Sequence, residues 1–457
     1  MGKRSAKAAT ALFAGLAVVA FLCAPNIRAQ DLPDSAPLLT LNQAIEISIA
    51  DNLTLKIAGL EINKAKFDVA ATKTKRLPAL QTYLFGSVLI TPVNFTFPVG
   101  AFGTYKNVGP IPGMEQKITT PAGTLNTYAL AQAAQPLSQL YKLHLGNREK
   151  ELSVDLDSEK YREQRQNVVK QVKQAYYSIL QSQSALQAAQ ASVKQYEELD
   201  RVMSEKLSQE AALKSDSMEV KAKLAQERYN VLQLTDQLQS RREQLNDLLG
   251  RDLATAFRTE DVPAMAAEES DLRTAQQMAL SKRPEIKQAE INVQQADYDR
   301  RLAKAQYIPD VAVAVHYTSP FNVKFVPKNI VAAGFELNWE PFDWGRRKDE
   351  INQKKIVLDQ SQLQLKDVQS KVLLDVDNRF RTLQETRVLL TVAKTAADAA
   401  TEKLREMTQK FGQQSVLLRD VLQQQAAVAS ANSNYEQALL SFWTSKAEFE
   451  KAVGEDR

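Results

Sequence analysis

The chain of 457 residues has little of the chemistry on which most enzymes and metalloproteins rely. Its one cysteine is Cys23, and its two histidines are His144 and His316. No metal-binding or phosphate-binding motif accompanies them. Cys23 lies in an N-terminal segment that we expect to be removed, so the mature protein has no disulfide framework. We therefore predict no enzyme activity, no cofactor and no metal site.

The chain also lacks a hydrophobic run suited to a transmembrane helix. The apolar run over residues 8–24 is short and rich in alanine, and it follows three basic residues. That order is typical of a secretory leader, so we predict a signal peptide over residues 1–29. A lipid attached to Cys23 is the alternative, which the bulky Leu22 disfavours.

Neither basic nor acidic residues predominate in the predicted mature chain. Four of the 58 basic residues lie in the predicted leader, which leaves 54 basic against 54 acidic residues in the mature chain. A neutral mature chain gives no reason to expect a nucleic-acid partner.

Glycine and proline are absent from residue 147 to residue 249. Apolar residues there recur in steps of three, four or seven, which is the spacing of a coiled-coil seam. We predict one helix over about 140–207, roughly 100 Å long at about 1.5 Å per residue. A second such helix is predicted over about 346–407. No compact domain accommodates rods of this length.

Most informative is an internal duplication. Residues 41–80 are mirrored by residues 272–311 at an offset of 231, and later pairs keep offsets of 205 and 204. Such a repeat indicates two copies of one structural unit. The identical pairs include Ala44/Ala275, Lys56/Lys287, Asp68/Asp299, Pro78/Pro309, Pro136/Pro341, Asp216/Asp420 and Gly250/Gly454.

Each copy is predicted to contain a helix, a strand, a loop, a strand, a long helix, a turn and a helix. The first repeat spans 30–250, a linker spans 251–270, and the second repeat spans 271–457. The four strands are predicted at about 78–90, 125–135, 309–319 and 329–340.

The strands of the second copy alternate between apolar and polar residues. Over 329–340, five apolar side chains point one way, whereas Glu336, Asn338 and Glu340 point the other. About ten residues with one apolar face is the pattern of outer-membrane barrel strands. We expect the three polar residues to face a lumen. A soluble, half-buried sheet is the alternative.

The prolines at the helix–strand junctions place all helices at one end of the hairpins. Four strands cannot close a spanning barrel, because the smallest has about eight. An open edge in hydrocarbon costs several kcal/mol per unpaired backbone group. Two chains would make eight strands, and three would make twelve with a lumen. The first hairpin loop is 26 residues longer than the second and either constricts the mouth or has no role.

With these features the chain resembles the TolC-like outer-membrane efflux family over nearly all of its mature length. The resemblance rests on Leu39–Ile45, Leu77-Pro78, Ala211–Asp216, Pro341–Arg347 and Lys410–Leu422. It implies a mainly α-helical homotrimer with a twelve-stranded barrel, four strands per chain, in the Gram-negative outer membrane. A long α-helical barrel would continue into the periplasm. A periplasmic adaptor and an inner-membrane transporter would be the partners of this passive duct.

The resemblance also singles out residues at the turns. Pro341, Asp343 and Gly345 match the family's strand-to-helix turn, and Asp343 or Ser138 is expected to cap the helix that follows it. Trp344 is expected near the rim of the barrel or in ordinary packing.

At the far ends of the long helices, Asp420, Asp216 and Gln423 are candidates for the periplasmic entrance. Capping of a helix start is the competing role for the two aspartates. Gln423 stands where the family often has a second acid, so strong cation block is not expected.

Two functions remain open at this point. The first is an exit duct for efflux or type I secretion, with the cargo chosen by the pump. The second is a soluble periplasmic coiled-coil adaptor or scaffold, which keeps the rods but needs no lipid-facing strands.

Overall fold

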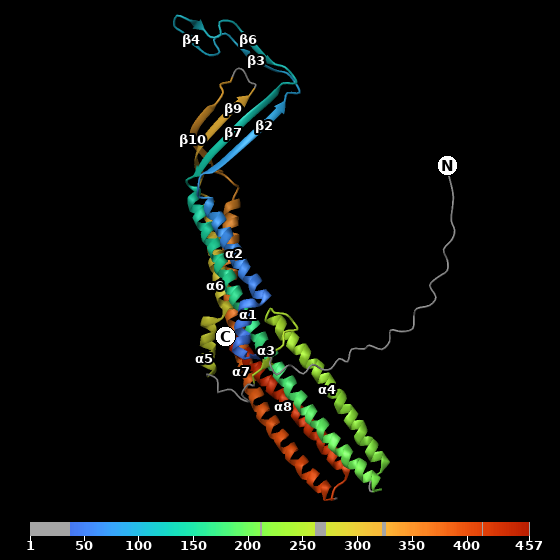
Figure 1. The fold of residues 1–457 in the computed structure, drawn as a ribbon. Helices are drawn as coiled ribbons and strands as arrows, with labels where there is room; N and C mark the ends of the chain where they lie inside the picture. Colours follow the sequence, from blue (N-terminus) through green and yellow to red (C-terminus); the bar gives the residue numbers. More distant parts are fainter. Residues whose placement is uncertain (1–36, 211–212, 261–270, 322–325, 414, 457) are drawn as a thin grey trace, which may run out of the picture.

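The computed structural model describes residues 37–210, 213–260, 271–321, 326–413 and 415–456. The predicted signal peptide, Cys23 and half of the predicted linker lie outside these residues. The molecule is a long rod with a sheet at one end and two helical hairpins at the other (Figure 1). None of the described helices combines the length and the apolar composition that a membrane-spanning helix needs.

The helices follow the coiled-coil and amphipathic patterns of the sequence. The two longest contain 70 and 67 residues, so each is about 100 Å long, as predicted. The described helices are α1 (Leu41–Asp51), α2 (Leu53–Thr74), α3 (Gln139–Ser208), α4 (Lys214–Leu248), α5 (Leu272–Lys282), α6 (Pro284–Ala305), α7 (Arg346–Gly412) and α8 (Leu418–Val453).

The described strands are four long ones, which form the main sheet, and several short ones. The long strands are β2 (Ala79–Val88), β7 (Leu125–Pro136), β9 (Asp310–Phe321) and β10 (Ile330–Asn338). The short strands are β1 (Leu38–Leu39), β3 (Val93–Phe97), β4 (Thr104–Tyr105), β5 (Gly109–Pro110), β6 (Gln116–Thr120) and β8 (Arg258–Thr259).

The duplication is visible in three dimensions. Helices α1 and α2 correspond to α5 and α6 at the offset of 231, and α4 corresponds to α8 at 204. Above the middle of the rod, the helices pack in the order α2, α3, α6, α7. Below it, the order is α4, α3, α8, α7. Helix α7 therefore lies at the end of both packing orders, and α5 packs against it between them.

The core sits at the middle of the rod, where both repeats meet. Tyr176 of α3 is fully buried there, and its hydroxyl donates to the Leu39 carbonyl at 2.9 Å. Phe257, in the segment predicted as a linker, is buried in the same core. Gly250 ends the first repeat with φ +68°, and a Cβ at this position would lie 2.3 Å from the Asp51 carbonyl oxygen. Only glycine fits so close to another backbone.

The main sheet is antiparallel throughout, in the order β10-β9-β7-β2. The two hairpins therefore meet through β9 and β7. Strands β2 and β10 are left at the edges, each with one side unpaired by any described strand. Because three antiparallel steps separate them, these two edges run in opposite directions.

Candidate functional site: the sheet, its turns and the helical tips

The register of the sheet gives one apolar face and a second face, the polar face, that carries Gln132, His316 and Glu336 together with Phe85 and Leu130. One row crosses all four strands as Ala333, Val315, Ala133 and Leu80. Large apolar side chains on this face stand free in the single chain, and Phe335 is 80% exposed. The apolar face includes Leu80, Leu84, Val88, Ala129, Ala131, Ala133, Val311, Val313, Val315, Val331, Phe335 and Leu337.

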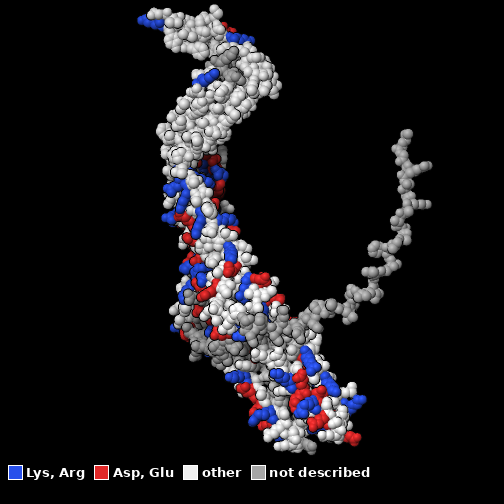
Figure 2. Space-filling model, in the orientation of Figure 1, with Lys and Arg blue, Asp and Glu red and all other residues white. Residues whose placement is uncertain are grey.

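Charge is nearly excluded from these strands. Asp310 and Glu336 are the two charged residues within β2, β7, β9 and β10. Figure 2 shows Lys, Arg, Asp and Glu crowded over the helices and almost missing from the visible surface of the sheet. An exposed apolar face of this height suits hydrocarbon rather than water.

The polar face carries a small hydrogen-bonded group. The Glu336 carboxylate accepts from Gln132 Nε2 at 2.9 Å and lies 3.0 Å from His316 Nε2. Asn338 is on the same face of β10, opposite Asp310. These side chains come from three strands, so the group exists only once the sheet has formed.

Glu340 differs from the other two residues predicted to face a lumen. It follows the end of β10, and its carboxylate pairs with Arg346 at 2.7 Å and with Arg347 at 3.0 Å. Arg347 also donates to the Glu340 carbonyl at 2.7 Å. Glu340 therefore ties the strand end to the first turn of α7.

The strand-to-helix turn after Pro341 is built around Asp343. Its carboxylate accepts from the backbone N–H groups of Gly345 and Arg347, each at 3.1 Å. Burial by itself opposes ionisation, but these two bonds and the nearby arginines hold the pKa of Asp343 below its usual value. Gly345 adopts φ +90° directly before α7. Asp343 thus satisfies an N–H group of the helix start, as predicted.

Trp344 lies in the same turn and is 89% exposed. Its ring contacts Phe342 edge-on, with centroids 4.6 Å apart. In the first repeat, Ser138 has a different role from the predicted cap. Its hydroxyl donates to the Pro309 carbonyl and accepts from Val311 N–H, so it joins the two hairpins. The prediction of a Ser138 cap is wrong, because partners 171 and 173 residues away take its hydroxyl.

At the far end of the rod, Asp216 and Asp420 lie on the first turns of α4 and α8. The two residues belong to different helical hairpins, whose tips are separate in Figure 1. The Asp420 carboxylate accepts from Leu417 N–H at 3.2 Å and lies 3.9 Å from Arg419. Gln423, one turn further along, is exposed. The geometry gives one Asp420 carboxylate oxygen a bond to the backbone that precedes α8 and places the other oxygen beside Arg419.

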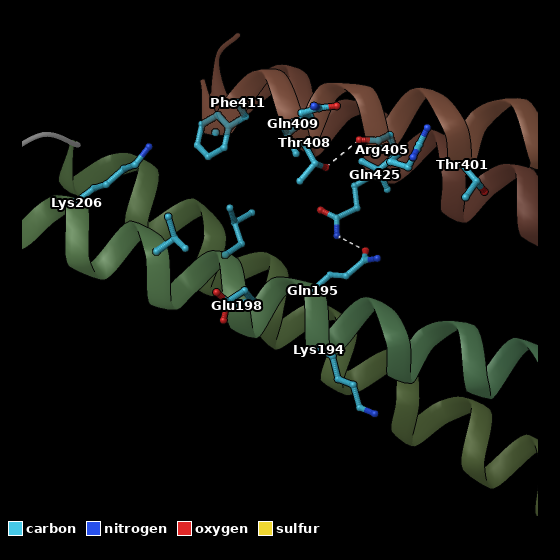
Figure 3. Close-up of a pocket in the computed structure, with 15 residues that line it drawn as sticks. Lys194, Gln195, Glu198, Lys206, Thr401, Arg405, Thr408, Gln409, Phe411 and Gln425 are labelled. Carbon is cyan, nitrogen blue, oxygen red and sulfur yellow. Dashed lines mark hydrogen bonds between the residues drawn. The ribbon is translucent and has the colours of Figure 1, made fainter. Parts of the chain in front are cut away.

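A groove of 1170 Å³ separates the two hairpins just above their tips (Figure 3). It ends at Lys206, whose ammonium lies 4.5 Å from the Phe411 ring centroid, and it is crossed by a 2.8 Å bond from Gln425 to Gln195. Apolar side chains line it between these contacts, namely Leu199, Val202, Leu404 and Val421. The sequence contains no signal that separates these glutamines from its many others.

Above the groove, polar pairs join α3 to α8. Ser184 donates to the Glu436 carboxylate, and Lys173 pairs with Glu450. The second oxygen of Glu436 is buried with no hydrogen-bond partner among the described residues. Burial raises the pKa of Glu436, and the bond from Ser184 offsets only part of that effect. Within the described part of the chain, no group of three His, Cys, Asp or Glu residues is arranged to hold a metal ion.

The sequence patterns of both repeats match a known family. The model for outer membrane efflux proteins matches residues 44–251 and 275–455. The chain belongs to the outer membrane efflux protein family. No curated protein sequence matches this efflux protein individually.

Solved structures share the fold of this efflux protein at low sequence identity. The outer-membrane channel OprN has a TM-score of 0.72 at 15% identity, covering 91% of this chain and 89% of its own. The CmeC outer membrane channel of Campylobacter jejuni gives 0.69 at 14%, covering 91% and 85%. The outer membrane protein VceC of Vibrio cholerae gives 0.70 at 13%, covering 91% and 96%.

The family and the fold together confirm the main predictions. This efflux protein is an outer-membrane channel, with a sheet for the membrane and long helices on the periplasmic side. The family favours this interpretation over the soluble periplasmic adaptor. Its members are channel proteins rather than enzymes.

Proposed function

We propose that this outer membrane efflux protein works as a homotrimer that closes a twelve-stranded barrel above a continuous helical barrel. The observation that carries the proposal is the pair of unpaired edges, β2 and β10, on a sheet with an exposed apolar face. Neither edge can remain open in hydrocarbon. Because the edges are antiparallel, β2 of one copy continues the sheet onto β10 of the next.

The helices support the same head-to-tail closure. Helix α2 lies at the β2 edge, and Leu53, Ile57, Leu60 and Phe67 form an exposed apolar stripe along one side of it. On α7, at the β10 edge, Ile356, Leu363 and Leu374 are also exposed. A heterologous contact of this kind closes into a ring when the rotation permits. Three copies leave a lumen, whereas two would fill it with side chains.

A cysteine pair tests the closure, since the mature chain is expected to have no cysteine of its own. Thr82→Cys on β2 is combined in turn with Val331→Cys, Ala333→Cys and Phe335→Cys on β10. We expect one of the three combinations to give oxidised multimers, together with heat-modifiable trimers in outer membranes. Thr82→Cys with Val315→Cys is the matched control, because β9 is shielded by its neighbours. Monomers in every combination, without heat-modifiable trimers, would contradict the proposal.

We further propose that Asp216, Asp420 and Gln423 surround the periplasmic entrance, and that Glu336 and Asn338 face the lumen. Support comes from their places at the helical tips and on the polar face of the sheet. Cargo moves passively through the duct from an inner-membrane transporter. The second partner is an adaptor protein in the Gram-negative periplasm.

The groove between the hairpins is the proposed adaptor site. Its apolar lining and polar ends suit a helical partner laid along it. A photo-cross-linking amino acid at Val202, inside the groove, is expected to capture the adaptor in cells. The same group at the exposed Gln233 of α4 serves as control. Equal capture at both positions would remove the groove from the adaptor site.

A further inference from the structure

The connection between β2 and β7, residues 89–124, forms an arm that the second hairpin lacks. Within it, β3 pairs with β6 and β4 pairs with β5. Val88 faces Leu125 in the main sheet, and Val93 faces Thr120 in the arm. Each strand advances five residues between these pairs, so the arm keeps the register of the hairpin without a bulge. Strand pairing is interrupted over residues 89–92 and 121–124, where Gly123 adopts φ +84°, so the arm is a second ordered ribbon set at a bend from the hairpin.

The arm is amphipathic. Phe95 faces Ile118 on one side of the ribbon, next to Val93 and Phe97. On the other side, Thr119 donates to the Asn94 side chain at 2.6 Å. Exposed apolar side chains continue along the arm, from Ile90 at its root to Val99, Phe102, Val108 and Met114 beyond β3 and β6. Of these, Ile90 is 92% exposed and Val108 is 70% exposed.

Charge on the arm is sparse. Lys106, Glu115 and Lys117 are its three charged residues. A surface built to lie on anionic lipid carries a cluster of basic residues, and two lysines beside one glutamate do not make one. The exposed apolar side chains therefore call for a protein surface that covers them.

The dimensions of the barrel indicate which surface that is. Twelve strands about 4.8 Å apart and tilted by about 40° enclose a ring of roughly 12 Å radius. Strand β3 alone, with 5 residues, spans about 17 Å. In Figure 1 the arm bends at the end of β2 and runs back above β9 and β10 instead of continuing along β2. The four strands of one chain form one third of this ring. An arm that crosses above them from β2 to β10 follows a chord of the ring, a straight line that passes about 6 Å from the barrel axis.

We propose that the three arms of a trimer pack against one another through their apolar side chains and cap the outer mouth of the channel. The proposal rests on the homotrimer proposed above. The covering surface is the same arm of the neighbouring copy, because an arm that crosses from β2 toward β10 ends at the edge where β2 and the arm of that copy begin. Chords at half the radius reduce the open mouth to less than about half of its area.

Cross-linking tests the contact between arms. Phe102→Cys at the tip, combined with Ile90→Cys at the root, is expected to give disulfide-linked multimers within heat-modifiable trimers after mild oxidation, because the tip of one arm meets the root of the next. Thr96→Cys, on the polar side of β3, combined with Ile90→Cys is the matched control and is expected to remain unlinked. Intact trimers with no cross-link between positions 102 and 90, or equal cross-links in both combinations, would overturn the cap. Loss of the trimer in the unmodified protein would instead overturn the proposed function.

Access from outside tests the cap itself and does not depend on the periplasmic entrance. Gln81→Cys places a thiol on the polar face of β2. Intact cells that carry this variant are treated either with a small maleimide or with a bulky maleimide that carries a polyethylene glycol chain. Replacing residues 93–120 by an Asn-Gly turn is expected to raise labelling by the bulky reagent several-fold and to leave the small reagent almost unaffected. Unchanged labelling by both would contradict the cap. Quenching of a fluorophore at position 102 by brominated lipids would show that the arms lie on the membrane instead.

Discussion

The sharpest test of this channel concerns two neighbouring residues on opposite faces of β10. Phe335 is the sixth of the nine residues in the strand and is 80% exposed on the apolar face. Gly334 points to the polar face, where nothing lies within 4 Å of an added Cβ. Replacing each by arginine puts the same charge at the same height, once toward lipid and once toward the lumen.

The expected magnitudes differ widely. An arginine facing lipid near the midplane of an outer-membrane barrel costs about 2–4 kcal/mol. Three copies in a trimer raise the cost of Phe335→Arg to about 6–12 kcal/mol. Gly334→Arg keeps its charge in water, near the Glu336 carboxylate, so its cost should stay below about 1 kcal/mol per chain. Phe335→Leu, which keeps an apolar side chain, should cost less than about 1.5 kcal/mol.

Two measurements compare the variants. The first is the fraction of heat-resistant trimer in outer membranes, and the second is the free energy of unfolding from lipid vesicles in urea. We expect Phe335→Arg to lose most of its trimer, while Gly334→Arg and Phe335→Leu assemble. If both arginine variants behave alike, the two faces of the sheet do not separate lipid from lumen. The orientation on which the channel interpretation depends would then be wrong.

Three further predictions concern the helices. Phe67→Asp should weaken the trimer by about 1.5–3 kcal/mol per interface, judged by its heat resistance, whereas Lys66→Asp, outside the apolar stripe and about 100° around α2 from Phe67, should not. Asp420→Asn should raise conductance or alter cation block in planar bilayers if the charge lines the entrance. An altered melting temperature with an unchanged single-channel current would show that Asp420 only caps the start of α8. Burial raises the pKa of Glu436 in the folded protein above 4.5. The protonated carboxyl therefore adds to the free energy of unfolding below pH 4.5, and this contribution is lost as the pH rises through the folded pKa. In urea titrations at several pH values, Glu436→Gln should therefore show a smaller decrease in the free energy of unfolding toward neutral pH than the unmodified protein. The same pH dependence in both proteins would contradict this assignment.

Residue patterns predicted the long helices and the four strands because each depends on local spacing. The glycine-free and proline-free stretch after Asn147 and the alternation along β10 are visible without any tertiary contact. The repeat offsets likewise predicted which elements correspond, and Asp343 was one of the two residues expected to cap a helix from their places before one. The helix, strand and cap patterns involve residues within a few positions of one another, whereas the duplication is found by comparing the two copies residue by residue.

The remaining features involve partners far apart in the chain. Ser138 was expected to cap a helix but binds Pro309, and Glu340 pairs with arginines of the next helix. The groove depends on the spacing between α3 and α8, which no local pattern encodes. The arm looked like a turn-rich loop, and only the pairing of β3 with β6 showed it to be ordered.

The sequence by itself determined the kind of object, a duplicated chain of rods and apolar-faced strands that needs copies of itself. Periodicity carries that information because it acts through neighbouring residues, and the repetition carries it because the second copy shows the same local pattern again. Only the tertiary structure decided the strand order, the open edges at β2 and β10, and the group around Glu336. Those features arise from contacts between segments about 200 residues apart, where packing geometry rather than local preference selects the partner.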